Sequence, residues 1–344
     1  MVALGSAFLF GLSTPLAKYL VESVAPLALA GLLYLGSGLG LTIILGGRHI
    51  SRPSEHSISL PQRSEWVWLI GAILFGGVAG PVALMYGLEA SAASTASLLL
   101  NLEAVFTALL AWSLFRENFD RRIALGMFAI VAGGLVLAWQ PEAQGEGSLG
   151  LAFIAVACLC WAVDNNLTRK VSASDAVLIA GLKGLVAGAV NLGLARLFAQ
   201  PLPPLGVASL AMAVGFLGYG VSLVLFVIAL RHLGTARAGA YFSVAPFFGA
   251  ALAVLIQGES VSLQLVAAGA LMAAGVWLHL TEQHRHLHAH EQQEHKHPHS
   301  HDEHHRHSHD FAWDGREPHT HHHVHAPLVH AHAHYPDVHH RHPH

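Results

Sequence analysis

Residues 98–117 read LLLNLEAVFTALLAWSLFRE, in which one acid, Glu103, stands well inside an apolar run. The run extends over residues 91–114, and roughly 20 apolar residues are enough to cross about 30 Å of hydrocarbon as a helix. It lacks the continuous charged stripe that a helix on the surface of a soluble protein would show. The stretch therefore predicts a transmembrane helix with an ionisable group near its middle.

Comparable apolar stretches follow one another as far as Leu280, separated by short clusters of charged and turn-forming residues. A soluble protein of this size would show polar faces throughout, so the pattern predicts an all-α membrane protein. The first stretch has neither a basic segment before it nor a small-residue cleavage site after it, so we expect a span there and not a signal peptide. The ten predicted transmembrane helices are residues 2–20, 24–46, 66–88, 91–114, 122–140, 149–169, 176–195, 206–230, 235–257 and 260–280.

The basic residues are divided unequally between the two sides of the predicted membrane. With ten spans, the N-terminus, the even-numbered loops and the C-terminal tail lie on one side of the membrane. On the other side the only basic residues are Arg196 and, at the end of the first span, Lys18. This bias predicts a multi-pass protein of the cell (inner) membrane with both termini in the cytoplasm. The basic residues on the predicted cytoplasmic side are Arg48, Arg52, Arg63, Arg116, Arg121, Arg122, Arg169, Lys170, Arg231 and Arg237.

Prolines and glycines inside the spans indicate how the helices bend and pack. Pro15, Pro81 and Pro246 each remove a backbone donor and so bend or break their helix. Two interpretations stay open, harmless kinks or bent helices that line a substrate cavity. Small residues four positions apart allow helices to approach closely, and they recur at Gly36/Gly40, Gly76/Gly80 and Gly184/Gly188.

The run at 98–117 has a counterpart 142 residues later, where residues 240–259 read AYFSVAPFFGAALAVLIQGE. A shift of 151 similarly aligns residues 10–18 with residues 161–169. Two halves of five spans must enter the membrane from opposite sides, because five is odd. This is the inverted-repeat plan of secondary transporters, whose substrate site lies near the midplane between the halves. The identical pairs at the shift of 142 are Phe106/Phe248, Ala108/Ala250, Leu110/Leu252, Ala111/Ala253 and Glu117/Glu259.

Three stretches carry a resemblance to a known family. They are FGLSTPLAK near the start, SAASTASLLLNLEAVFTALLAWSLFRE in the fourth span and CWAVDNNLTRK in the sixth, and they resemble the EamA-type drug/metabolite transporter family. The resemblance covers residues 1–280 and implies a ten-helix bundle of two five-helix repeats, 1–140 and 141–280. It also implies export or exchange of small metabolites, often by proton coupling. The fourth span departs from the family pattern, since Ala104 stands where the other half has Pro246.

Glu103 is the main candidate for a functional residue, because ionisable groups are costly inside hydrocarbon. A carboxylate at this depth needs a hydrogen-bond donor, a cation or a proton of its own. Two interpretations stay open. Glu103 either couples transport to protons or binds a cationic substrate group, or else it is a buried neutral hydrogen-bonding residue.

Asp164 and Lys183 lie at a similar predicted depth on the sixth and seventh spans, about 10 Å from the cytoplasmic end. They can pair across neighbouring helices, as a structural lock or as a gate that the substrate must break, and the lock is favoured. Asparagines could line a polar route beside them or merely bridge helices: Asn101, Asn165, Asn166 and Asn191.

Residues 281–344 differ from the rest, because all but four of the 28 histidines lie there and the long apolar runs stop. A segment with so few apolar residues cannot bury a core, which predicts a disordered tail. Neutral imidazole suits nickel, zinc, cobalt and copper, although no cofactor is expected to be required. The candidate metal ligands are His284, His286, His288, His290, His295, His297, His299, His301, His304, His305, His307, His309, His321, His322, His323 and His325.

Metal binding in the tail has three interpretations. The tail could capture or sense metal for a metal transporter, it could store metal unrelated to the solute, or it could be inert or respond to pH. Histidines with a pKa near 6.5 become cationic at lower pH and could then adhere to anionic lipid heads.

The favoured function is a secondary transporter, most simply an exporter, that works by alternating access on a small solute. The alternatives are a nickel, cobalt or zinc transporter and a membrane metal sensor or scaffold that transports nothing. An enzyme is not expected, because the spans contain no His-Glu-x-x-His or Gly-x-Ser-x-Gly arrangement and no nucleotide-phosphate loop. The expected partners are membrane lipid and a small molecule or metal ion, not nucleic acid, and a homodimer stays open.

Overall fold

The computed structural model separates into two compact units, Met1–Thr281 and Glu282–His344, and each is considered by itself. The described residues of the first unit are 2–51, 61–115, 121–139, 146–171, 175–226, 228–229 and 241–281. Those of the second unit are 284–290, 293–299, 319–325 and 328–334.

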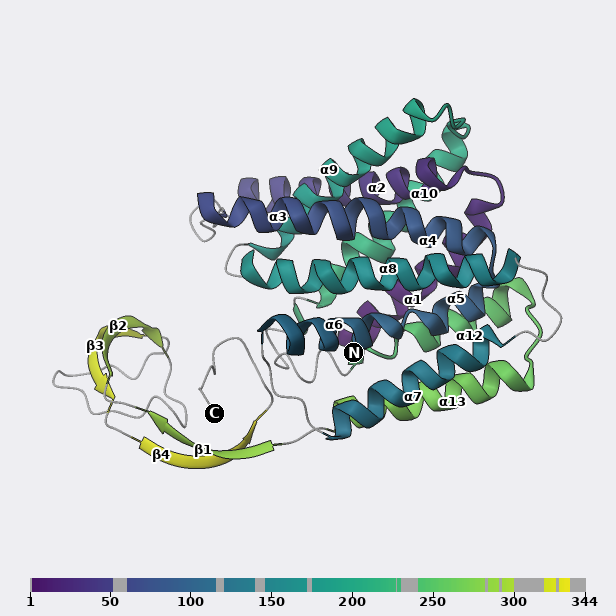
Figure 1. The fold of residues 1–344 in the computed structure, drawn as a ribbon. Helices are drawn as coiled ribbons and strands as arrows, with labels where there is room; N and C mark the ends of the chain where they lie inside the picture. Colours follow the sequence, from purple (N-terminus) through teal and green to yellow (C-terminus); the bar gives the residue numbers. More distant parts are fainter. Residues whose placement is uncertain are drawn as a thin grey trace. The chain divides into compact units, whose positions relative to one another are not determined.

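The first unit is a bundle of helices that lie roughly alongside one another (Figure 1). Its α-helices are α1 (Val2–Val21), α2 (Pro26–Ser51), α3 (Trp66–Ala72), α4 (Gly80–Glu89), α5 (Ala93–Leu99), α6 (Leu102–Phe115), α7 (Arg121–Ala138), α8 (Glu146–Thr168), α9 (Ala176–Leu197), α10 (Leu205–Gly215), α12 (Ala245–Gln257) and α13 (Leu263–Leu280). Among the described residues, two segments are π-helical, η2 (Ile73–Ala79) and η4 (Phe216–Val221), and two are short 3₁₀-helices, η1 (Arg63–Glu65) and η3 (Arg169–Val171).

Eight stretches among the described residues are long and apolar enough to cross a membrane, which confirms a multi-pass helical membrane protein. They are Val2–Val21, Pro26–Gly47, Arg63–Glu89, Ala93–Leu110, Arg121–Ala138, Leu149–Thr168, Val177–Leu197 and Leu205–Phe226. The last two predicted spans coincide with shorter apolar helices, Ala245–Gln257 and Leu263–Leu278. Residues 230–240, where the ninth span is predicted to begin, lie outside the described residues. The count of ten therefore stays a prediction.

The two halves share their irregular features. The third and eighth predicted spans are each interrupted by a π-helical segment, at 73–79 and 216–221. The fourth and ninth are each interrupted by a turn, at 100–101 and 243–244. Both pairs are related by a shift of 142 to 143 residues, close to the shift found in the sequence. The fourth span thus breaks without a proline, whereas Pro246 follows the turn in the ninth and lies in the first turn of α12.

Helix packing follows the same pseudo-symmetry. Counterpart helices pack on each other, α2 on α9 and α7 on α13, and the α1–α12 contact mirrors the α6–α8 contact. Close approach depends on the predicted glycines. A Cβ at Gly184 would lie 2.6 Å from the amide nitrogen of Gly38, and a Cβ at Gly36 would overlap the carbonyl of Met212. These contacts agree with the predicted role of small residues between helices.

The hydrophobic core is unevenly distributed along the bundle. We call the end where α1 ends, α5 begins and α12 ends the packed end. Its core is one large cluster with residues from the eight long apolar stretches and from both shorter apolar helices. Its members include Leu20, Leu33, Leu88, Leu99 and Met272. Towards the opposite end the described buried residues form four smaller, separate clusters. At the packed end, therefore, the helices share one continuous hydrophobic core, whereas at the opposite end their described residues form only small separate clusters.

The described residues of the second unit are extended, and disorder of the tail as a whole stays a prediction. Its described residues form four strands, with β1 (His284–His290) antiparallel to β4 (Leu328–His334) and β2 (Gln293–His299) antiparallel to β3 (His319–His325). The His-x-His alternation has the two-residue period of a strand, and backbone hydrogen bonds between strands do not require a large core. The register sets His286 opposite His332 and His297 opposite His321. The remaining candidate ligands His301, His304, His305, His307 and His309 lie outside the described residues.

Candidate functional site

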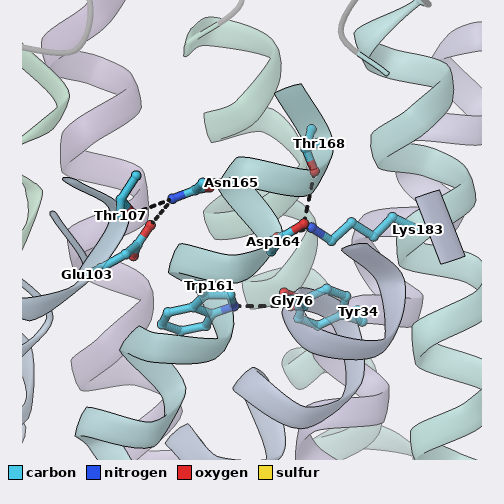
Figure 2. Close-up of polar contacts among 9 residues, drawn as sticks. All are labelled: Tyr34, Gly76, Glu103, Thr107, Trp161, Asp164, Asn165, Thr168 and Lys183. Atoms are coloured by element: carbon cyan, nitrogen blue, oxygen red, sulfur yellow. Dashed lines mark hydrogen bonds and ion pairs between the residues drawn. The ribbon is translucent and has the colours of Figure 1, made fainter. Parts of the chain in front are cut away.

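Two consecutive residues of α8, Asp164 and Asn165, connect two polar groups inside the bundle (Figure 2). With 3.6 residues per turn, neighbouring side chains leave a helix about 100° apart. Asp164 therefore reaches towards α9, and Asn165 reaches towards α6. We call the first group, Asp164 with Lys183 and Thr168, the ion-pair cluster; the second, Glu103 with Thr107 and Asn165, is the acid cluster.

The ion-pair cluster contains the pair predicted from the sequence. Asp164 is 6% exposed as a residue. Its carboxylate forms a salt bridge with the Lys183 ammonium and accepts a 2.9 Å hydrogen bond from the Thr168 hydroxyl. Helices α8 and α9 both pack against η2, so the pair meets across this π-helical segment. A Cβ at Gly76 would overlap the carboxylate. The absence of a side chain at Gly76 therefore makes room for the ion pair.

The π-helical segment η2 exposes backbone acceptors beside this pair. Pro81 has no N–H group, so the carbonyls of Gly76 and Gly77, five and four residues before it, lack a helical donor at that position. The Gly76 carbonyl instead accepts hydrogen bonds from the Tyr34 hydroxyl at 2.7 Å and the Trp161 indole at 3.0 Å. Both donors are visible in Figure 2. Pro81 thus has a structural consequence beyond a kink, because it releases acceptors that join α2 and α8 to η2.

The candidate asparagines have different surroundings. Asn191 donates to the Gly77 carbonyl at 3.0 Å and therefore also contacts η2. Asn101 donates to the Leu98 carbonyl at 2.8 Å, within the turn that divides the fourth span. Asn166 donates to a carbonyl of its own helix at 2.9 Å and lies 3.4 Å from the Thr107 carbonyl. Of the candidates, only Asn165 contacts the Glu103 side chain.

Within the acid cluster, the Glu103 carboxylate accepts a hydrogen bond from an uncharged donor. The side-chain amide of Asn165 donates to Glu103 Oε1 at 2.8 Å and lies 3.4 Å from the Thr107 hydroxyl. In the described part of the chain, no lysine or arginine forms a salt bridge with Glu103, whereas Asp164 has Lys183. The sequence required a donor, a cation or a proton at Glu103, and the structure supplies the donor. The two acids therefore differ, because one is paired with a cation and the other is not.

The acid cluster lies in the half of the bundle opposite to the packed end, and it is partly exposed. Asn165 is exposed, although Cys158 and Trp161, on the same side of α8 at helical spacing, are buried. The outward side of α8 is a different one, marked by exposed Val156 and Leu159. The exposure of Asn165 therefore reflects an opening on an inward side of the helix. We call the end opposite to the packed end, where α6 and α8 end, the accessible end.

Burial also decreases along the fourth span, from the packed end towards the accessible end. Within α5, at the packed end, every residue except Thr95 is buried. Within α6, only Val105 is buried among the residues whose exposure is described, and Glu103 and Thr107 are half-buried. The segment that carries the acid thus faces a less tightly packed part of the bundle than the segment before it.

The counterpart position in the other repeat lacks the charge. The shift of 151 relates Asp164 to Ser13, and the shift of 142 relates Gly76 to Gly218. Ser13 lies beside Gly218 as Asp164 lies beside Gly76, since a Cβ at Gly218 would be 2.5 Å from the Ser13 Cβ. The backbone arrangement is therefore repeated, whereas the position of the charged Asp164 is taken by the uncharged Ser13 in the other repeat.

Sequence reasoning missed four residues of the site. Tyr34, Trp161 and Thr168 are hydrogen-bond donors, and Thr107 is an acceptor for the Asn165 amide. Their partners lie far away in sequence or depend on side-chain direction, and only Pro81 after two glycines could have indicated the free carbonyls. Lys18, predicted at the end of the first span, contacts the end of α4, where its ammonium donates to the Leu88 carbonyl at 2.7 Å.

Metal ligation in the tail stays a prediction. Among the residues that the structure describes, no three histidine, cysteine, aspartate or glutamate side chains come together as a metal site. The cross-strand register of the histidines is the only structural relation described for the candidate ligands.

Comparison with known proteins gives a family match over most of the chain. The model of the EamA-like transporter family matches residues 1–139 and again residues 148–281. An uncharacterized transporter of Methanothermobacter thermautotrophicus is 28% identical over 282 residues, which cover 78% of this chain and 82% of that protein. The uncharacterized transporter YyaM of Bacillus subtilis is 23% identical over 295 residues, covering 80% of this chain and 93% of that protein.

A solved crystal structure has a similar fold. It superposes with a TM-score of 0.59 at 20% sequence identity and covers 81% of this chain and 94% of the other. At this identity, the likeness extends to the fold alone.

Proposed function

Because this chain belongs to the EamA-like transporter family, we propose that it is a secondary transporter that carries a small solute across the cell membrane by alternating access. The observation that supports this most strongly is Glu103, an acid without a cationic partner in the described part of the bundle, half-buried and in the partly exposed acid cluster. Together with the basic bias of the loops, this supports a bundle open towards the cytoplasm, from which the solute is taken for export.

In this proposal, Glu103 binds either a proton or a cationic group of the solute. A carboxylate that accepts one neutral hydrogen bond from Asn165 keeps further lone pairs free for a ligand. Inside a membrane the charged carboxylate is costly, so binding of a proton or a cation is favoured there. Because the two ligands compete for one group, solute binding would release a proton, and a pH gradient could then drive transport.

Asp164 and Lys183 act as a lock in this proposal. The carboxylate already has two partners, the Lys183 ammonium and the Thr168 hydroxyl, and it is almost completely buried. A buried pair of this kind costs much when one partner is removed, whereas its net contribution against apolar residues is small. The pair would therefore keep α8, η2 and α9 moving as one body.

Proteoliposomes test whether the chain transports and which class of solute it takes. Vesicles loaded with a pH-sensitive dye would receive a panel of amines, amino acids, Ni²⁺, Co²⁺ and Zn²⁺. A proton flux with amines or amino acids, absent from empty vesicles, supports the organic-solute function. A flux with the metal ions alone favours the metal transporter, and no flux with any member contradicts a proton-coupled transporter for these classes.

A further inference from the structure

At the packed end, two polar contacts join the two repeats where α12 ends. The Gln257 side-chain amide donates to the Pro15 carbonyl at 2.6 Å. The Glu259 carboxylate accepts the backbone N–H groups of Ala93 at 2.7 Å and Ser94 at 3.0 Å. Helix α12 belongs to the second repeat, whereas α1 and α5 belong to the first. Both contacts therefore bridge the two repeats.

Local structure explains why Glu259 reaches α5. Gly258 follows α12 with φ +67°, the left-handed conformation that ends helices and that glycine adopts most easily. The chain turns there and brings Glu259 to the first turn of α5, whose N–H groups have no partner within the helix. Ala93 and Ser94 are 0% and 3% exposed, so their N–H groups depend on this carboxylate. Hydrogen bonds to a charged acceptor are stronger than neutral ones.

The same span carries both the Glu259 contact and the acid cluster. Helix α5 begins at Ala93, the span breaks at Leu100 and Asn101, and α6 then carries Glu103. A movement of α5 relative to α12 would therefore be passed along one divided span to the acid.

We propose that Glu259 is a latch that holds the packed end shut, and that its release from α5 is a step of the transport cycle. The second part rests on the proposed function, because alternating access requires the packed end to open when the accessible end closes. Contacts that bridge the repeats at the packed end must then break. Glu259 is half-buried at the end of α12, so water can replace its backbone partners when they separate.

Cysteine accessibility in nanodiscs tests this latch without a known solute, because both ends of the bundle are then reachable. The background is Cys158→Ala with Cys160→Ala, which removes the two native thiols. Ser97→Cys reports on the packed end, since Ser97 is 0% exposed and its hydroxyl would be 2.7 Å from a Cβ at Gly249 of α12. In a separate protein, Asn165→Cys reports on the accessible end.

Glu259→Gln should increase the rate of maleimide labelling at the packed-end reporter about tenfold, the ratio expected when a charge-assisted bond becomes neutral. It should slow labelling of the accessible-end reporter severalfold, because the two ends alternate. Glu22→Gln, which removes an exposed acid at the same end, is the matched control and should change neither rate. Glu259→Asp should give an intermediate result.

Two outcomes would overturn the latch. One is an unchanged rate at the packed-end reporter in Glu259→Gln, and the other is a faster rate at both reporters, which indicates general loosening. Neither readout requires transport. If labelling changes as expected but no transport is measured, the proposed function is contradicted and the Glu259 latch is retained. If transport is measured but labelling does not change as expected, the latch alone is contradicted.

Discussion

The carboxylate of Asp164 occupies the space that a side chain at residue 76 would fill, so the buried ion pair with Lys183 depends on Gly76. This relationship joins three helical segments at one point. Asp164 comes from α8, Lys183 comes from α9, and η2 between them supplies the glycine and the free carbonyls. The bundle near the acid cluster thus depends on contacts between segments far apart in the sequence.

Gly76→Ala should destabilise the protein by about 2 kcal/mol or more, because the new methyl group displaces a buried charge from its partner. Thermal unfolding in detergent measures the change. Gly193→Ala is the control, since a Cβ at Gly193 within α9 would meet no neighbouring atom within 4 Å. That substitution should be neutral or slightly stabilising. Equal stability of the two variants would show that the carboxylate does not need the space.

Asp164→Asn should lower stability by about 3 to 5 kcal/mol, because it leaves the Lys183 ammonium without its carboxylate. Adding Lys183→Met should recover most of this loss, since the double variant has no unpaired charge. If the pair is a lock, exchanging the residues as Asp164→Lys with Lys183→Asp should also retain transport. Loss of transport in a correctly inserted exchange variant would identify the pair as a gate.

Tyr34→Phe and Trp161→Phe each remove one donor from the Gly76 carbonyl. Each single variant should cost about 1 kcal/mol, because the second donor still satisfies the acceptor. The double variant should cost more than the sum, since a buried carbonyl then loses both partners. A double-mutant cycle in denaturant measures the coupling, and strictly additive values would contradict the shared acceptor.

Truncation after Leu280 should leave the helical unit folded, because it is a compact unit that ends at Thr281. Titration with Ni²⁺ should show binding to the full chain and little to the truncated chain, since the candidate imidazole ligands have been removed. Cells that carry the truncated chain should then be compared with cells that lack the protein under nickel stress. If both strains are more sensitive to nickel than cells with the unchanged protein, a metal substrate is favoured. If both tolerate nickel as those cells do, an organic solute is favoured.

The sequence was sufficient for features that depend on local pattern. Apolar runs, the position of Glu103 within one of them, the repeat and the pairing of Asp164 with Lys183 all follow from periodicity and spacing. The division of the fourth span was harder to predict, because it breaks at Leu100 and Asn101 without a proline.

Contacts that depend on tertiary packing could not be read from the sequence. The Gly76 carbonyl accepts hydrogen bonds from Tyr34 of α2 and Trp161 of α8, two helices that meet at the π-helical segment η2. Asn101 and Asn166 looked like Asn165 in the sequence, yet their amides bond to nearby carbonyls instead of to Glu103. Side-chain direction, which spacing alone does not determine, separates them.

The most direct test of the central claim is pH-gradient-driven transport of an active solute in proteoliposomes containing Glu103→Gln. Our account predicts loss of at least about 100-fold, because the amide can neither bind a proton in exchange nor pair with a cation. The exposed-acid control Glu22→Gln should transport as the unchanged protein does. Undiminished gradient-driven transport by Glu103→Gln would contradict the claim that Glu103 is the coupling or cation-binding group.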